Sequence, residues 1–144
     1  MGLCNTMEKA TLDRVFGQTL WSQPTGTYLA LSTAAPTDTL NGFSEPAGYN
    51  YSRQLLRSSG TIDWSEPQIK DGVAGTFETH NINDFSFGRA TGDWGIITHF
   101  VVFNHITNST ESDALVWGAM TVSKEVKLGD LITFNSGDLV VQVG

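Results

Sequence analysis

The residues with the greatest capacity for chemistry are three histidines. His99 and His105 have the same strand parity, but six residues of extended chain would separate their Cα atoms by about 20 Å, too far for one zinc ion. His80 lies in a polar segment with Glu78 and Asp84, which could orient its ring, although this composition is common in loops. His99 stands inside an apolar run, where a hydrogen-bonded core histidine is expected. The histidines therefore predict no metal site.

The other residues with catalytic potential also lack a motif. Cys4 is the one cysteine, so neither an internal disulfide nor a thiolate metal site can form, and no histidine is near it in the expected N-terminal tail. No serine stands in a G-x-S-x-G elbow, and the glycines of residues 88–92 do not match G-x-G-x-x-G. Asp130 and Asp138 lie at turns, where Asp is expected for backbone reasons. The sequence therefore predicts no catalytic residues and no cofactor, and we expect a protein that is not an enzyme.

Charge and hydropathy exclude two kinds of partner. The 8 Lys and Arg against 15 Asp and Glu give a net charge of -7, which argues against nucleic acid because phosphate binding needs clustered basic residues. Arg53 with Arg57, and Lys124 with Lys127, are interpreted as solvated charges on strand faces. No apolar run approaches the roughly 20 residues of a membrane helix, so no membrane partner is expected. The first residues also lack the apolar stretch of a secretory signal.

The densest apolar run predicts a central hairpin. Residues 96–103 and 114–120 are rich in β-branched and aromatic side chains, and the Asn, Ser and Thr of residues 104–113 favour an exposed loop between them. Because the first strand is apolar on both faces, it cannot be an edge strand in water. We expect Trp94, His99, Phe100 and Phe103 to be mostly buried and residues 108–112 to be exposed.

The remaining strands are predicted at short spacing. They cover residues 27–32, 51–57, 61–64, a stretch that follows the Asp71-Gly72 turn and ends at Phe77, and residues 83–87, 131–134 and 139–143. The last two are expected to pair as a hairpin across the 135–138 turn, after a turn at residues 128–130. This count of eight to ten strands predicts one domain over residues 1–144, an all-β antiparallel sandwich of jelly-roll type.

Residues 1–17 are predicted to form an N-terminal helical segment. Asn5 is placed to cap a helix over residues 5–16, Glu8 completes a capping box, and Gly17 ends it. The helix is too short to be stable alone, so the domain or another subunit must cover its apolar face, and the alternative is a disordered tail.

Five apolar residues are predicted to contact a partner. Leu12, Val15 and Phe16 share one face of the helix. The other two, Phe43 and Tyr49, lie in the loop of residues 34–50, which is long enough that we expect it either to bind a partner or to be ordered by a neighbour.

Four segments resemble a known family. These are LSTAAP at 31–36, EPAGYNYSR at 45–53, WGIITHFVVF at 94–103, and GAMTVSK at 118–124 with the later Gly129-Asp130 turn. Together they resemble small tailed-bacteriophage virion proteins, labelled tail-fibre-like proteins or capsid cement proteins, over most of the chain. Met120 stands where that family more often has Leu, a change that conserves volume. The motifs are structural, so the resemblance implies a virion protein that is made in the host cytoplasm.

The first hypothesis is a capsid cement or decoration protein. It would bind the major capsid protein on the outer surface as a dimer or trimer, since an acidic protein suits the outside of a DNA-filled head and symmetric oligomers gain from multivalency.

Two other hypotheses stay open. One is a tail-fibre or tail-tip subunit. The other is a carbohydrate-binding jelly roll with a stacking platform of tryptophans, although tryptophans beside glycine at strand ends are more often part of a core. The four candidates for such a platform are Trp21, Trp64, Trp94 and Trp117.

Overall fold

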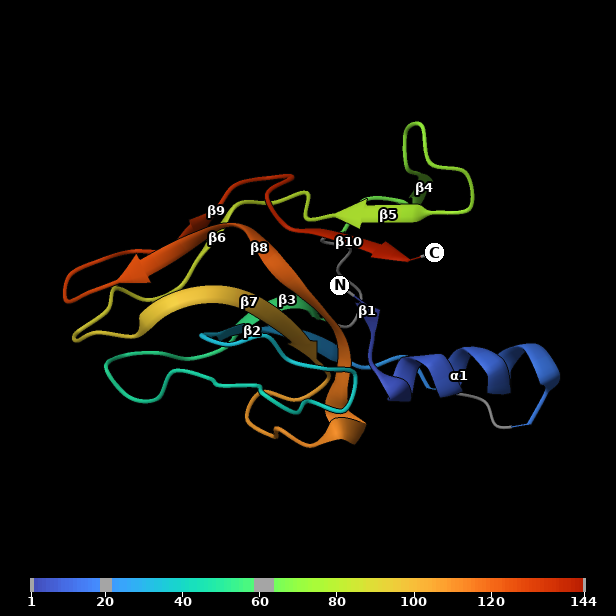
Figure 1. Cartoon of the computed structure of the whole chain (residues 1–144), viewed down its shortest axis with the longest axis horizontal. Coiled ribbons are helices and arrows are strands. Elements are labelled where there is room, and N and C mark those ends of the chain that lie inside the picture. The colour runs from blue at the N-terminus through green and yellow to red at the C-terminus, as the bar shows by residue number, and fades with distance from the viewer. Residues whose placement is uncertain (1, 19–21, 59–63, 144) are drawn as a thin grey trace.

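The computed structural model describes residues 2–18, 22–58 and 64–143, and β-strands dominate it (Figure 1). In chain order the first elements are β1 (Gly2–Leu3), α1 (Asn5–Phe16), β2 (Gly26–Ser32), β3 (Gln54–Ser58), β4 (Gln68–Ile69), β5 (Phe77–His80) and β6 (Phe85–Ser86). They are followed by β7 (Gly95–Phe103), the short 3-10 helix η1 (Glu111–Asp113), β8 (Ala114–Val126), β9 (Thr133–Phe134) and β10 (Val140–Val143).

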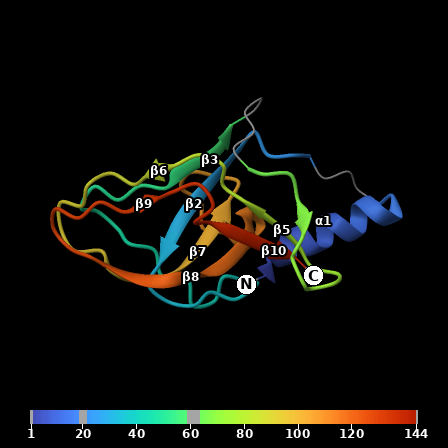
Figure 2. The same ribbon diagram turned by 90° about the horizontal axis from the view of Figure 1, so that it is seen from above.

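The strands form three antiparallel sheets in the described part of the chain. A five-stranded sheet has the order β1-β8-β7-β2-β3, a three-stranded sheet the order β10-β5-β4, and β6 pairs with β9. The two smaller sheets lie on one side of the large one (Figures 1 and 2). The all-β, sandwich-like class is thus confirmed, whereas the strand pattern of a jelly roll is not.

The core has two parts, one on each face of the large sheet. The larger part joins Leu29, Leu31 and Ile97 of the large sheet to Phe134 of β9 and to Leu139, which immediately precedes β10. The second part lies on the opposite face and is covered by the loop of residues 34–50. It consists of the buried Cys4, Ala30, Val101, Phe103 and Ala114, with Leu40, Phe43 and Trp117 packed against them. Alternation along the strands therefore supplies apolar side chains to both faces.

The predicted central hairpin is confirmed. β7 lies between β8 and β2, so it is an interior strand. Trp94, Phe100 and Phe103 are buried and His99 is half-buried, while residues 105–112 are exposed. The turns at Gly72, Gly129 and Gly137 are also found, each with the positive φ that favours glycine.

The predicted hairpin of the last two strands is wrong. β9 pairs with β6, and β10 pairs with β5. The buried Asn81 explains this, because its amide group donates to the carbonyls of Asn83 and Asn135 (both 2.9 Å) and accepts the Leu139 N–H (2.9 Å). These bonds direct the chain after the 135–138 turn towards β5.

Three other strand predictions need correction. The strand after the Asp71-Gly72 turn is β5, which begins at Phe77, and its exposed or half-buried side chains give no apolar signal. β3 begins at Gln54 because the Leu31 N–H donates to the Tyr51 hydroxyl (3.0 Å), so the ladder with β2 ends at Gln54. Of the strand predicted at 61–64, residues 61–63 lie outside the described part, and Trp64 forms an isolated bridge with Asn81.

The N-terminal helix is confirmed over Asn5–Phe16, with one difference at its start. Cys4 is the N-cap, and it makes no side-chain capping bond. Gly17 ends the helix in the left-handed conformation, with φ 66°. The expectation that Cys4 lies in a tail is wrong, because β1 pairs with β8 and Cys4 is fully buried.

Candidate functional site

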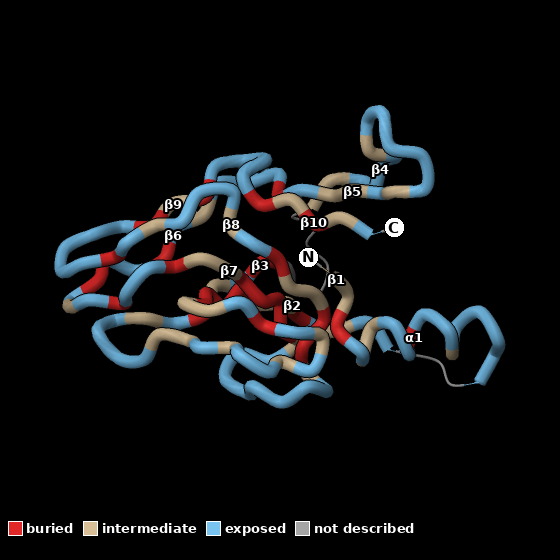
Figure 3. Tube along the Cα trace, viewed as in Figure 1, coloured by how far each residue is buried: buried red, intermediate tan, exposed pale blue. Residues whose placement is uncertain are grey.

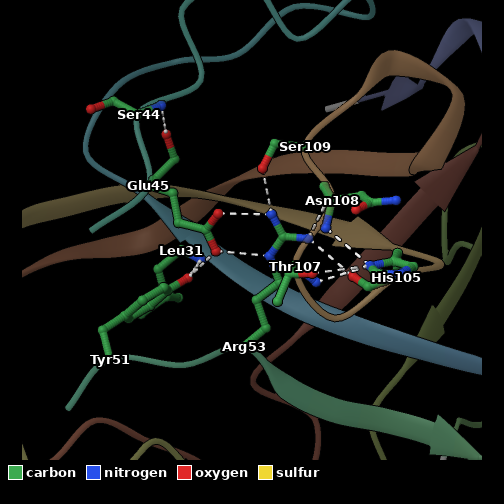
Figure 4. Close-up of polar contacts among 10 residues, drawn as sticks. Leu31, Ser44, Glu45, Tyr51, Arg53, His105, Thr107, Asn108 and Ser109 are labelled. Carbon is green, nitrogen blue, oxygen red and sulfur yellow. Dashed lines mark hydrogen bonds and ion pairs between the residues drawn. The ribbon is translucent and has the colours of Figure 1, made fainter. Parts of the chain in front are cut away.

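Arg53 is the centre of the polar contacts that order the loops (Figure 4). Its Nε and Nη2 donate to the two carboxylate oxygens of Glu45 at 2.8 and 2.7 Å, the bidentate geometry of a strong ion pair. Its guanidinium carbon lies 3.9 Å from the centre of the Phe103 ring, and the side chain is 2% exposed. The interpretation of Arg53 as a solvated charge is therefore wrong.

The remaining donors of Arg53 hold the loop between β7 and β8. Nη1 donates to the carbonyls of His105 (3.0 Å) and Asn108 (2.7 Å), and Nη2 donates to the Ser109 hydroxyl (2.7 Å). All five N–H donors of the guanidinium are thus used. One side chain therefore joins the loop of residues 34–50 to the loop of residues 104–113.

Tyr51 and His105 complete this network. The Tyr51 hydroxyl donates to Glu45 (2.8 Å), and burial together with the Glu45 charge raises the pKa of Tyr51, so the hydroxyl keeps its proton. His105 Nδ1 accepts the backbone N–H groups of Thr107 (3.1 Å) and Asn108 (3.0 Å), which folds the loop back on itself. The loops are thus ordered by neighbouring residues, one of the two roles expected for residues 34–50.

The same loop also holds the base of α1. The Asn5 amide donates to the Glu111 carboxylate and the Thr6 hydroxyl donates to the Glu111 carbonyl, both at 2.9 Å. The Cys4 N–H donates to the Leu115 carbonyl at 2.9 Å. The base of the helix is therefore fixed to β8 and η1 by backbone and side-chain bonds.

Beyond its base, α1 projects from the β-sheets (Figures 1 and 2), and we call residues 9–16 the arm. Its surface is largely exposed (Figure 3). Leu12, Val15 and Phe16 are 60, 69 and 70% exposed. The structure thus brings the three predicted helix residues together on the arm, and the alternative that they belong to the core of their own chain is wrong.

The two predicted loop residues lie elsewhere. Phe43 is half-buried, with its ring centre 5.5 Å from that of Phe103, the last residue of β7. Tyr49 is 59% exposed, and its carbonyl accepts the indole N–H of Trp94, just before β7 begins. They thus lie near opposite ends of β7, although the six residues of chain between them keep their Cα atoms within about 22 Å of each other. Of the two, only Phe43 packs against the core cluster that contains Cys4, at the base of α1.

The ring nitrogens of His80 and His99 lie within hydrogen-bond distance of neighbouring hydroxyl groups. His80 Nδ1 lies 3.2 Å from the Ser65 hydroxyl, so neither Glu78 nor Asp84 orients it. His99 Nδ1 lies 2.8 Å from the Thr98 hydroxyl, and burial lowers the pKa of His99. In the described ranges, no three His, Cys, Asp or Glu side chains are grouped so that they could hold a metal ion.

Two of the four tryptophans use their indole N–H groups inside the molecule. Trp94 donates to the Tyr49 carbonyl (3.0 Å) and Trp117 donates to the Asp38 carboxylate (2.8 Å). Trp64 is half-buried, and Trp21 lies outside the described residues.

No helix in the described part of the chain has the length and apolar character needed to cross a membrane.

The fold and the arm define a small all-β module with a firmly held, projecting helix. The profile of the podophage GP4 fiber I protein gp80 family matches residues 2–142. The chain belongs to this family, and it is a bacteriophage virion structural protein. No curated protein matches the sequence.

Proposed function

We propose that this protein is a subunit of a virion fibre that acts by assembly and not by catalysis, and that the arm is one of its contact surfaces. The observation that carries the proposal is the exposed apolar stripe of Leu12, Val15 and Phe16 on a helix whose base is rigidly bound. Membership of a family described as fibre proteins supports the fibre over the capsid surface.

The arm has the physical properties of an assembly contact. A helix of 12 residues is marginal in water, and this one is stabilised by the burial of Cys4 at its N-cap and of Ala10 at the start of the arm. Clustered exposed apolar side chains mark interaction sites in soluble proteins. A rigid base lowers the entropic cost of binding, because the direction of the arm is already set.

The polar groups support a structural role. Arg53, Glu45 and Tyr51 are all bonded to one another or to backbone, and they order loops. The net charge of -7 favours a protein partner over nucleic acid. We propose other virion proteins and further copies of this chain as those partners.

The position on the particle can be tested by immunogold labelling of intact virions. An antibody raised against the purified protein is expected to label projections from the tail. Label spread over the head would overturn the fibre proposal and would support capsid decoration instead. The number of copies per virion, measured against the major capsid protein by quantitative gel analysis, gives an independent measurement, because a decoration protein is far more abundant than a fibre.

A further inference from the structure

A cleft of about 590 Å³ opens between β8 and β10. Its floor includes the core residues Phe100 and Phe134, and its walls include Met120 and Val122 from β8 and Val140 from β10. Val122 is 69% exposed. The cleft is therefore a hollow with apolar side chains on its floor and walls.

The pairing of β8 explains why the cleft is open. Ile97 pairs with Lys124 and His99 pairs with Ala119, so β7 advances two residues while β8 advances five. The three extra residues form a large bulge that places Met120 and Val122 outside the regular ladder, and bulges of this kind re-aim side chains. β1 pairs with β8 only at Val116 and Trp117, so no described strand covers the outer edge of β8 beside the cleft.

The charges of the cleft and the arm are complementary. The cleft has two carboxylates, Glu78 and Asp138, and one ammonium group, Lys124, which lies 5.4 Å from the centre of the Phe134 ring. On the arm, Lys9 pairs with Asp13, which leaves Arg14 exposed and outside the ion pairs of the described residues. The arm therefore presents one net positive charge to a cleft with one net negative charge.

We infer that the arm of one copy docks in the cleft of a second copy, with Leu12, Val15 and Phe16 over the apolar wall. A chain cannot fill its own cleft, because its arm is fixed at the base and points outward in both ribbon views (Figures 1 and 2). The arm is about 12 Å long, so only a few of its side chains would enter the cleft, which is a hollow of that size. Such a contact joins two different surfaces, so its repetition closes a ring or extends a filament.

Paired cysteines test this contact with purified protein. Val15→Cys on the arm and Val122→Cys in the cleft are made as separate variants, mixed, and exposed to a mild oxidant. The expected result is a disulfide-linked pair of chains in the mixture and in neither variant alone. The native Cys4 gives little background because it is fully buried.

The matched control replaces Val122→Cys with Leu128→Cys, whose side chain is 71% exposed and does not line the cleft. Equal cross-linking with this control would overturn the inference. So would cross-linking of Val15→Cys alone, which would show arm-to-arm packing, and so would the absence of any cross-linked product.

Sedimentation of the unmodified protein gives the second measurement. We expect concentration-dependent association, weakened about tenfold or more by Phe16→Asp. Arg14→Glu should weaken it more than Lys127→Glu, which makes the same charge change away from the cleft. A protein that stays monomeric at all concentrations would overturn the docking but not the fibre proposal, because the latter depends on the position on the virion.

Discussion

At the residue scale, Arg53 shows how a buried charge is tolerated in this fold. A buried ion loses its hydrogen bonds to water, and protein groups must replace them. For Arg53 these groups are a bidentate carboxylate, two carbonyls and one hydroxyl. The planar guanidinium can also lie over Phe103, which a lysine could not do equally well. The side chain thus sets the positions of two loops and, through η1, of the base of α1.

Removal of Arg53 should therefore be costly. Arg53→Met leaves the Glu45 carboxylate with only the Tyr51 hydroxyl as a donor and the carbonyls of His105 and Asn108 without the donors that Arg53 supplies, and we expect the free energy of unfolding to fall by about 3–5 kcal/mol. Urea denaturation measures this loss. The control is Lys127→Met, which removes an exposed ion pair with Glu125 and should change stability by less than about 1 kcal/mol. Equal effects of the two variants would show that Arg53 is not the centre of the network.

The raised pKa of the Cys4 thiol predicts that the folded protein loses stability at alkaline pH. Burial, with smaller effects from the carboxylates of Asp38, Glu111 and Glu8, raises the pKa of the Cys4 thiol from 9.0 to about 12. Above pH 9 the unfolded chain loses this proton while the folded chain keeps it. The free energy of unfolding should then fall by up to about 1.4 kcal/mol per pH unit, until the folded thiol ionises as well.

The measurement is urea denaturation at a series of pH values above about 8, with Cys4→Ala as the control. Tyr51 contributes a similar loss only above its ordinary pKa of 10.0. The wild-type protein should therefore lose stability between pH 9 and 10 more steeply than the variant. Parallel pH profiles in this interval would contradict the prediction.

At the element scale, the sequence predicts a helix or strand correctly where the residue pattern that identifies it is local. The β7–β8 hairpin has long apolar strands and a polar loop, and α1 has a periodic stripe and a terminal glycine, so both were found. β5 lies in a polar segment and its side chains are exposed or half-buried, so no apolar alternation marks it as a strand. The pairing of β10 with β5 depends on Asn81, whose bonds to Asn135 and Leu139 cross 54 and 58 residues of chain.

The candidate site divides in the same way. The stripe of Leu12, Val15 and Phe16 could be predicted, because helical spacing is a local property. The role of Arg53 could not, since its partners His105 and Asn108 are 52 and 55 residues away. The one local signal was the segment of residues 45–53, which contains Glu45, Tyr51 and Arg53 together. The cleft depends on a bulge in β8, and apolar periodicity gives no indication of that.

The role of Asn81 gives a prediction for the last strands. Asn81→Ala removes two donors and one acceptor, and each buried group left unpaired should cost about 1–3 kcal/mol. The Leu139 amide loses its acceptor, so its hydrogen exchange should become faster, which NMR can measure. Asn135→Ala is the control, because the exposed Asn135 contributes its backbone carbonyl to this site. Unchanged exchange at Leu139 in Asn81→Ala would show that the chain reaches β5 for another reason.

At the scale of the whole molecule, the protein combines a stable β-body with an arm that is fixed at one end only. Bonds from Arg53 to the 104–113 loop, and from Glu111 to Asn5 and Thr6, connect the body to the base of α1. On the arm itself Ala10 is the one buried residue, and the apolar stripe beyond it is exposed. The residues that stabilise the fold and the proposed assembly contact therefore lie in different parts of the chain, and substitutions should be able to separate their effects.

The double variant Val15→Ser, Phe16→Ser tests this separation. Both side chains are about 70% exposed, so the midpoint of thermal unfolding of the isolated protein should shift little, as for other surface substitutions. Incorporation into virions should fall, because assembly would lose two apolar contacts. Particles grown with the variant as the sole source of the protein are compared with wild-type particles by quantitative gel analysis. The control is Leu128→Ser, an equally exposed residue at a turn of the body, which should leave incorporation unchanged. Normal incorporation of the double variant would show that the arm is not an assembly contact, and a large fall in its melting temperature would show that the arm supports the fold.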